Sequence, residues 1–362
     1  MDPFRHYNEL PPLPPKATID TTRVLRAAID ANRELGRLSG YCSQLPNQEI
    51  LLNSIVLKEA RASSEIENIV TTQDELYRAL AVNYASVEPA TKEVLNYRSA
   101  MWTGLKSLRA CGLITTNLIE NVQRELEQND AGIRRLPGTA LVNDATGQAI
   151  YTPPDEETRI RDLLRNLEEY LNTDLHQVDP LIRMSVAHYQ FESIHPFYDG
   201  NGRTGRIINV LYLIKEGLLE SPILYLSRHI IRNKSRYYEL LQSVRTDNDW
   251  EEWVLFMLAS VESTSVQTLR TIELIADLME STITLARDRL PRSTYSKELI
   301  ELLFVQPYTK IEHLVDAGIA ERRTASKYLK QLEEVGILRS FKSWKETIYI
   351  NHELMALLRG TD

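Results

Sequence analysis

Residues 195–206 read HPFYDGNGRTGR, and this stretch decides how the chain is interpreted. It holds one imidazole, one carboxylate, three glycines and two guanidiniums within twelve residues. The backbone N–H groups of Gly200-Asn201-Gly202 can turn inward as an anion nest. A helix expected to begin at Thr204-Gly205 adds its positive end, and Arg203 and Arg206 can grip phosphate oxygens. The pattern therefore predicts a loop that holds a polyphosphate at the start of a helix.

Two residues of this stretch carry groups that can do chemistry beside such a loop. Imidazole titrates near neutral pH, so a positioned neutral His195 can take a proton from a hydroxyl. Asp199 offers a hard carboxylate that suits Mg²⁺ bound to phosphate oxygens. The stretch is neither a Walker A loop nor a His-Glu-x-x-His zinc site, and His188 is expected to be a structural histidine. An ordinary glycine-rich loop with a core histidine would explain any two of these residues. It would not explain all of them occurring together in this order.

The rest of the chain predicts a mainly α fold, because apolar residues recur at helical spacing over most of its length. A Pro-rich arm occupies residues 1–20. The exception to helix is the segment 139–152, where two short apolar runs flank an Asn/Asp/Gly turn and predict a β-hairpin. Helices are expected from Thr21, after a cap at Asn47, at 59–70, on both sides of Cys111-Gly112, and at 156–172, 178–193, 204–216, 232–244, 249–264 and 265–289.

The C-terminal region, residues 292–362, reads as helix, helix, glycine, helix and two strands, which is the order of a winged helix. Its helix-turn-helix pattern places Arg322, Arg323, Lys327 and Lys330 on the second helix. The whole region nevertheless carries eleven bases against ten acids. A dedicated DNA reader usually shows a clear basic excess. The sequence therefore favours a protein-interaction or dimer-scaffold role over DNA binding.

Composition indicates a soluble cytoplasmic protein. The formal net charge of the 362 residues is −8, which argues against a surface that seeks nucleic acid or anionic membrane as a whole. The two cysteines imply no disulfide framework. The N-terminus has no signal-peptide pattern, and no apolar run approaches the roughly 20 residues that span a bilayer. We therefore expect no membrane partner.

Residues 195–206 match the Fic motif, H-P-F-x-[DE]-G-N-G-R-x-x-R, at every defined position. The chain resembles bacterial Fic proteins with an N-terminal inhibitory helix and a C-terminal winged helix. The resemblance implies a mainly α fold, in which a Fic helical bundle with a β-hairpin flap lies between these two regions. It divides the chain into an arm with helices (1–90), the Fic catalytic core (91–265), a linker helix (266–290) and a winged-helix domain (291–362).

The same resemblance implies a protein adenylyltransferase, which moves AMP from ATP to a Ser, Thr or Tyr hydroxyl of a target protein or of itself. His195 would be the general base, and Asp199 would hold Mg²⁺ as the cofactor. Arg203 would bind the β-phosphate of ATP and Arg206 the γ-phosphate. The full set of residues implied in phosphate binding is Gly200, Asn201, Gly202, Arg203, Thr204, Gly205 and Arg206.

The resemblance also assigns roles to two more segments. The hairpin at about 139–152 resembles the family's flap, on which a target protein docks by pairing its backbone with an exposed strand. A plain surface hairpin would look the same. Tyr237-Tyr238 resembles a family element near the adenine, with Tyr238 as the base contact, although a pair of tyrosines on a helix is as often part of a core.

Residues 63–68 match the family's inhibitory signature, [ST]-x-x-x-E-[GN], through Ser63, Glu67 and Asn68. Read alone, the pattern would be an exposed carboxylate on a surface helix. The resemblance implies that Glu67 pairs with Arg206 and so occupies the guanidinium that the γ-phosphate needs. The same carboxylate could instead position water and remove AMP, which would make the protein a de-AMPylase or a bifunctional enzyme.

The residues of the loop are also compatible with two different functions. The site could transfer another phosphate-linked group, or the chain could be a DNA-binding regulator that uses the Fic fold as a nucleotide sensor. The sequence does not define the target protein, the modified residue or what relieves inhibition. It also leaves the oligomeric state open, with a homodimer as one option because Fic relatives are often dimers.

Overall fold

The computed structural model describes residues 2–44, 49–81, 87–136, 138–142, 149–173, 178–343 and 346–360. The described chain is mainly helical with two small antiparallel sheets, as predicted. No helix among these residues is long and apolar enough to cross a membrane. The turn of the predicted hairpin (143–148) and the cap expected at Asn47 lie outside the described residues.

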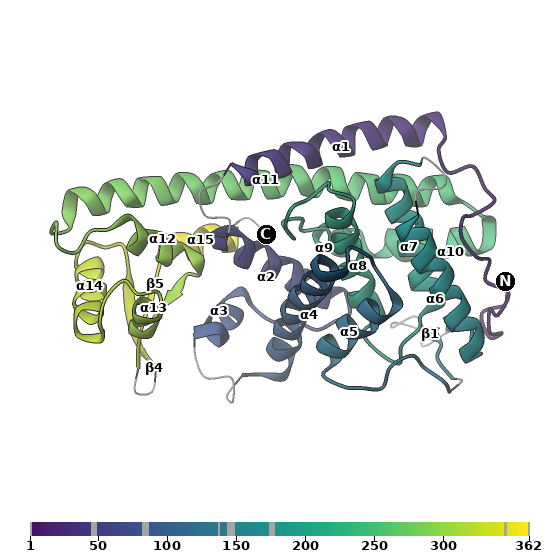
Figure 1. Cartoon of the computed structure of the whole chain (residues 1–362), viewed down its shortest axis with the longest axis horizontal. Helices are drawn as coiled ribbons and strands as arrows, with labels where there is room; N and C mark the ends of the chain where they lie inside the picture. Colours follow the sequence, from purple (N-terminus) through teal and green to yellow (C-terminus); the bar gives the residue numbers. More distant parts are fainter. Residues whose placement is uncertain are drawn as a thin grey trace.

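Two long helices run side by side along one edge of the molecule (Figure 1). They are α1 (Thr22–Ser43) and α11 (Trp250–Arg289). We expected two helices over 249–289, but α11 is continuous for 40 residues because neither glycine nor proline interrupts it. The boundary expected at 265/266 therefore falls inside one helix, which links the two ends of the molecule.

The segment before the central helices forms α2 (Glu49–Ile66) and α3 (Gln73–Ala81). We expected α2 as two helices, and the prediction was wrong because no breaking residue lies between them. The chain leaves α2 through Asn68, whose φ of 62° is left-handed. Asparagine adopts this conformation more readily than most residues, which explains the Asn or Gly of the 63–68 motif.

The central helices surround α7 (Pro180–Ile194), which is buried along almost its whole length. Its neighbour α8 (Asn201–Lys215) is also largely buried, so the loop between the two helices is held by core packing at both ends. Gly112 ends α4 (Pro89–Cys111) in a left-handed conformation, at the break expected there. The elements of this region are α4 (Pro89–Cys111), α5 (Thr116–Glu127), β1 (Leu141–Val142), β2 (Ala149–Tyr151), α6 (Glu157–Asn172), α7 (Pro180–Ile194), α8 (Asn201–Lys215), α9 (Ser227–Arg232) and α10 (Lys234–Asp247).

The Pro-rich arm wraps the body of the molecule. Leu10 and Leu13 are buried in the core, and Asn166 of α6 both donates to and accepts from the backbone of Leu13. Gln190 of α7 donates to the carbonyl of Pro11 at 2.8 Å. The arm therefore braces the two helices that precede the 195–206 loop.

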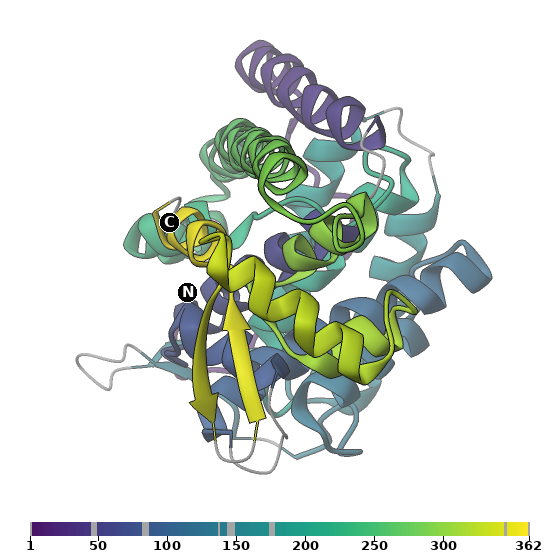
Figure 2. The same cartoon turned by 90° about the vertical axis from the view of Figure 1, so that its left-hand side faces the viewer.

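Residues 292–360, called here the C-terminal unit, contain the elements predicted for a winged helix. Figure 2 shows its helices and strands in front, with α11 seen almost end-on above them. The sequence did not predict the first strand or the last helix, which complete the sheet and the packing. The elements are α12 (Lys297–Val305), β3 (Tyr308–Thr309), α13 (Ile311–Asp316), α14 (Arg322–Glu334), β4 (Arg339–Ser343), β5 (Glu346–Ile350) and α15 (His352–Gly360), with the strands in the order β3-β5-β4.

The C-terminal unit docks on the segment that carries the 63–68 motif. Its helix α12 packs against α2, and its strand β3 lies against α3. Asp74 of α3 accepts hydrogen bonds from the Tyr308 hydroxyl at 2.5 Å and from Arg359 at 2.7 Å. The guanidinium of Arg78 lies 5.6 Å from the ring of Phe341. The N-terminal and C-terminal parts of the chain thus meet directly beside α2.

Candidate active site

The loop of residues 195–200 is shaped by two left-handed residues. His195 ends α7 with φ 48°, and its N–H still donates to the carbonyl of Phe191. Gly200 has φ 76° and directly precedes α8, which starts at Asn201, three residues earlier than expected. A Cβ atom on Gly200 would also lie 2.4 Å from a carboxylate oxygen of Glu127, so both the backbone conformation and the available space favour glycine there.

Asn201 fastens the loop to itself. Its side-chain oxygen accepts from the N–H of Phe197 at 2.8 Å, and its amide nitrogen donates to the carbonyl of the same residue at 2.9 Å. Phe197 is fully buried, and it forms an isolated antiparallel bridge with Ile133. The side chain of Asn201, which the resemblance implied in phosphate binding, is therefore engaged in holding the loop's shape.

The surroundings of His195 favour the neutral form of its imidazole. Burial, with the charge of Arg134 acting in the same direction, lowers its pKa to about 4. Glu67 opposes this shift, and Arg245 adds to it. The imidazole is therefore neutral at physiological pH and can accept a proton there.

Arg134 holds the end of α7 in place, and sequence reasoning missed it. Its guanidinium is buried and donates to the carbonyls of His195 at 2.7 Å, Ile194 at 3.3 Å and Pro154. Its backbone N–H donates to the carbonyl of Pro196 at 2.9 Å. This positive group thus caps the negative end of α7 and ties the base of the β1–β2 hairpin to the loop. The sequence around Arg134 contains no motif that would have indicated this role.

Asp199 is the exposed carboxylate of the loop, with 79% of its side chain accessible. Its Oδ1 atom accepts from the N–H of Gly200 at 2.7 Å, which fixes its direction. Among the described residues no cluster of three or more His, Cys, Asp or Glu side chains could hold a metal ion. One exposed carboxylate in the loop before α8 would fit Mg²⁺, because Mg²⁺ keeps several waters and combines one or two carboxylates with phosphate oxygens.

Arg203 is drawn away from solvent by two acids. Its side chain is 4% exposed and bonds to Glu127 at 2.8 Å and to Glu93 at 3.4 Å. Burial raises the pKa of Glu127, and the charge of Arg203 opposes this shift. Arg203, the residue expected to bind the β-phosphate, is therefore held in place by one acid on α4 and one on α5.

Arg206 meets the 63–68 motif, as the resemblance implied. Its Nη2 atom donates to Oε1 of Glu67 and to the carbonyl of Ser63, both at 2.8 Å, and its Nε atom donates to the Ser63 hydroxyl at 2.8 Å. Arg206 is 1% exposed, whereas the side chain of Glu67 is 34% exposed. Burial by itself would lower the pKa of Arg206, but Glu67, Tyr237 and Glu192 together outweigh it and raise that pKa. The guanidinium therefore stays charged and bound to α2.

Gly202 makes room for this pairing. A Cβ atom at this position would lie 2.3 Å from Oε1 of Glu67 and 3.0 Å from Nη1 of Arg206. The carboxylate of Glu67 thus lies directly over the first turn of α8, where an anion is favoured by the free N–H groups and the helix dipole. Glu67 occupies the kind of position that a phosphate group would take.

Two buried carboxyl groups lie near Arg206, and sequence reasoning did not find them. Burial raises the pKa of Glu192 to about 7, against the opposing charge of Arg206. Burial also raises the pKa of Glu59, which accepts from the N–H of Ser227 and from the Tyr97 hydroxyl. Of these two acids, Glu192 contributes to the raised pKa of Arg206.

The two tyrosines expected near the adenine differ in the structure. Tyr237 is buried, and its hydroxyl lies 2.9 Å from Nε2 of His188, which makes both part of the core. Burial also lowers the pKa of His188 to about 3, consistent with a structural, neutral histidine. Tyr238 is 37% exposed, so it is the member of the pair with a face open to solvent.

The predicted hairpin is present as β1 and β2, with Leu141 opposite Tyr151. The hydroxyl of Tyr151 donates to the carbonyl of Ser193 at 2.6 Å, and the guanidinium of Arg245 lies 3.9 Å from its ring. Val142 is half exposed. The inner strand is therefore anchored to α7, while the outer strand presents an apolar side chain to solvent.

Three family models match the chain in sequence order. The Fic/DOC family N-terminal model matches residues 25–106, and the Fic/DOC family model matches residues 113–213, which include the loop described above. The chain belongs to the Fic/DOC family. The C-terminal domain of SoFic-like protein adenylyltransferases matches residues 278–354 of this Fic protein.

Curated relatives of this Fic protein match it over shorter stretches. Protein adenylyltransferase Fic of Aedes aegypti is 32% identical over 103 residues, which are 28% of this chain and 19% of that protein. Protein adenylyltransferase fic-1 of Caenorhabditis elegans is 35% identical over 68 residues, which are 18% of this chain and 13% of that protein. The matches thus span less than a fifth of the length of these relatives.

Solved structures share the fold of this Fic protein. A Fic family protein from Desulfovibrio desulfuricans G20 aligns with a TM-score of 0.60 at 19% identity, and the alignment covers 93% of this chain and 98% of that chain. Fic-1 of Caenorhabditis elegans aligns with a TM-score of 0.54 at 21% identity, covering 70% of this chain and 76% of that chain. The first alignment spans almost the whole length of both chains.

Proposed function

We propose that this Fic protein transfers AMP from ATP to a hydroxyl group of a protein, and that Glu67 restrains the reaction. The observation that carries the proposal is the contact between Glu67 and Arg206 over the first turn of α8. A carboxylate bound where a phosphate-binding loop opens is expected to compete with a phosphate group for the same guanidinium. The names of the curated relatives, protein adenylyltransferases, support the reaction type.

In this reaction the hydroxyl oxygen attacks the α-phosphorus of ATP. The bond between that phosphorus and the α–β bridging oxygen breaks, pyrophosphate leaves, and the hydroxyl proton passes to the imidazole of His195. The low pKa of His195 keeps the imidazole neutral and ready for this proton. Arg134 orients the base by holding the carbonyls at the end of α7.

The remaining parts of the site bind and orient the phosphates. The N–H groups at the start of α8 and the guanidinium of Arg206 would receive phosphate oxygens. Asp199 would hold Mg²⁺, which supplies charge neutralisation between phosphates when it is bound. Because three hydrogen bonds from Arg206 now go to Ser63 and Glu67, the γ-phosphate must displace the carboxylate before it can use this guanidinium.

The experiment compares wild type, Glu67→Gly, and Glu67→Gly combined with His195→Ala. Each protein is incubated with Mg²⁺ and ATP that is radioactive at either the α- or the γ-phosphate. Transfer of AMP predicts that Glu67→Gly takes up the α label but not the γ label, and that His195→Ala abolishes the uptake. Uptake of the γ label would indicate a phosphorylating enzyme, and no uptake by Glu67→Gly would sink the proposal.

A second incubation separates restraint from reversal. Glu67→Gly protein that already carries AMP is mixed with unlabelled wild type. Release of AMP by the wild type would assign Glu67 a role in removing the modification, whereas stable modification would leave it as a restraint alone.

A further inference from the structure

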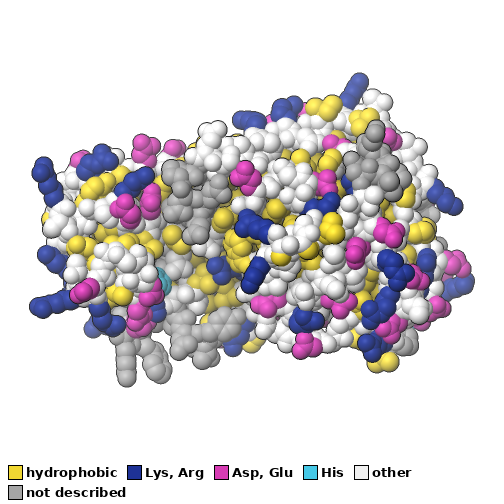
Figure 3. Space-filling model, in the orientation of Figure 1, with side chains coloured by type: hydrophobic (Ala, Val, Ile, Leu, Met, Phe, Trp, Pro, Cys, Tyr) yellow, Lys and Arg dark blue, Asp and Glu magenta, His cyan; other side chains and the backbone are white. Residues whose placement is uncertain are grey.

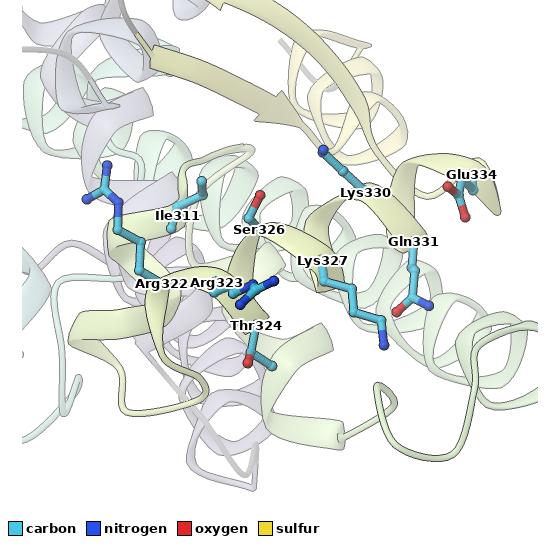
Figure 4. Close-up of a pocket in the computed structure, with 9 residues that line it drawn as sticks. All are labelled: Ile311, Arg322, Arg323, Thr324, Ser326, Lys327, Lys330, Gln331 and Glu334. Atoms are coloured by element: carbon cyan, nitrogen blue, oxygen red, sulfur yellow. The ribbon is translucent and has the colours of Figure 1, made fainter.

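One face of α14 gathers the basic residues of the C-terminal unit. Arg322, Arg323, Lys327 and Lys330 are exposed, while Ala325, Leu329 and Leu332 on the opposite side are buried. The basic residues border a hollow of about 970 Å³ that α14 forms with Ile311 of α13. Figure 4 shows these side chains spread along the outside of the helix. We call this surface the α14 face.

The α14 face is positive although the unit as a whole is nearly neutral. Arg322 lies 3.6 Å from Glu312, and 76% of its side chain is exposed. In the described part of the chain, Arg323, Lys327 and Lys330 form no ion pair. Two acids away from this face are paired with other bases, Glu301 with Lys297 and Glu346 with Lys310. Folding therefore separates charges that balance in the sequence, and Glu334 is the acid that lines the hollow.

The α14 face lies at one end of the molecule, away from the active site. In Figure 1, α14 is the element farthest from the central helices, and Figure 3 shows dark blue side chains at the same end. The docking of the unit on α2 and α3 uses α12, β3, α15 and the ring of Phe341 on β4, whereas α14 lies outside these contacts. A partner can therefore reach α14 while the unit stays docked.

We propose that the α14 face binds duplex DNA through its phosphate backbone. Residues 322, 326 and 330 form one stripe on the helix and residues 323, 327 and 331 form a second, so cations and short polar groups face outward over two turns. An α-helix of this kind fits the major groove, and Arg, Lys, Ser, Thr and Gln are the side chains that most often contact phosphates. The adjacent strand β4 adds two exposed cations, Arg339 and Lys342.

Two features favour DNA over an acidic segment of a protein. The cations lie on the second helix of a helix-turn-helix, followed by a β-hairpin, which is an arrangement that presents one helix to a groove and a hairpin to the flanking backbone. The face also lacks apolar anchors, since the exposed residues of the hollow are charged or polar apart from Ile311. Protein interfaces usually depend on buried aromatic or aliphatic anchors.

The test measures binding of the full chain to a fluorescent duplex of about 20 base pairs, roughly two helical turns. Salt is varied from about 50 to 200 mM, because the slope of log K against log salt counts the phosphate contacts. The triple variant Arg323→Ala, Lys327→Ala, Lys330→Ala should lower that slope by about 2.7 and weaken binding up to about 500-fold at 0.1 M salt. The matched control removes three exposed cations elsewhere, through Lys16→Ala, Arg26→Ala and Lys106→Ala, and should bind like wild type.

The outcomes distinguish this proposal from the proposed transfer activity. His195→Ala should bind the duplex as wild type does, because the α14 face lies outside the active site. No binding to the duplex at 50 mM salt, or equal loss in the triple variant and its control, would overturn the proposal. Binding of polyglutamate in preference to the duplex would overturn it in favour of an acidic protein partner.

Discussion

Replacing Glu67 by glycine should raise the incorporation of AMP by roughly 30-fold. A hydrogen bond to a charged group contributes about 1.5–3 kcal/mol. We take about 2 kcal/mol for the bond from Arg206, because the arginine is buried but the Glu67 carboxylate is one-third exposed. When the γ-phosphate no longer competes with this carboxylate, its binding to Arg206 becomes more favourable by about 2 kcal/mol. Since about 1.4 kcal/mol corresponds to a factor of ten, this difference is roughly 30-fold.

The assay measures radioactive α-phosphate incorporated per minute by wild type, Glu67→Gly and Glu67→Gln. Glutamine keeps a hydrogen-bonding group but loses the charge, so its rate should fall between those of wild type and Glu67→Gly. Glu65→Gln is the matched control on the same helix, and it should label like wild type because Glu65 does not contact Arg206. Equal labelling of Glu67→Gly and wild type, with both proteins folded, would refute the reasoning.

A binding measurement checks the same magnitude without relying on activity. A 30-fold lower Kd for ATP adds about 2 kcal/mol to the stabilisation by saturating ligand. The melting temperature of Glu67→Gly should therefore rise more on addition of ATP and Mg²⁺ than that of wild type. Without ATP the variant should melt lower than wild type, because a buried guanidinium has lost its carboxylate partner and keeps only Ser63.

Three more perturbations concern the base and the docking of the C-terminal unit. Labelling by the activated variant should fall as pH drops through about 4, since the pKa of His195 lies there and only the neutral imidazole accepts a proton; a pH–rate profile checks this. Arg134→Met should raise the pKa of His195 and move that acid limb to higher pH, whereas Arg134→Lys, which keeps the charge, should move it less. Asp74→Ala removes the acceptor shared by Tyr308 and Arg359, and it should lower the free energy of unfolding by about 1–2 kcal/mol in a denaturant melt.

The sequence determined the parts of this protein that depend on neighbours along the chain. The 195–206 stretch carries its own glycines, base and carboxylate, so its loop and the helix after it could be predicted from spacing alone. The break at Gly112 and the hairpin strands follow from local turn residues. The motif at 63–68 identified Glu67 as the partner of Arg206 only through resemblance, because nothing local relates residues 139 positions apart.

Tertiary structure decided the contacts that make the site specific. Arg134 donates a hydrogen bond to the carbonyl of His195, which is 61 residues away in the sequence. Glu127 accepts one from Arg203, which is 76 residues away. Asp74 joins the C-terminal unit to α3 across 234 residues. Local spacing fixes only which side chains share a turn or a face, whereas these contacts depend on how whole helices pack. The same packing gave a nearly neutral C-terminal sequence one basic face, because the apolar side of α14 is buried and its cations are left on the exposed side.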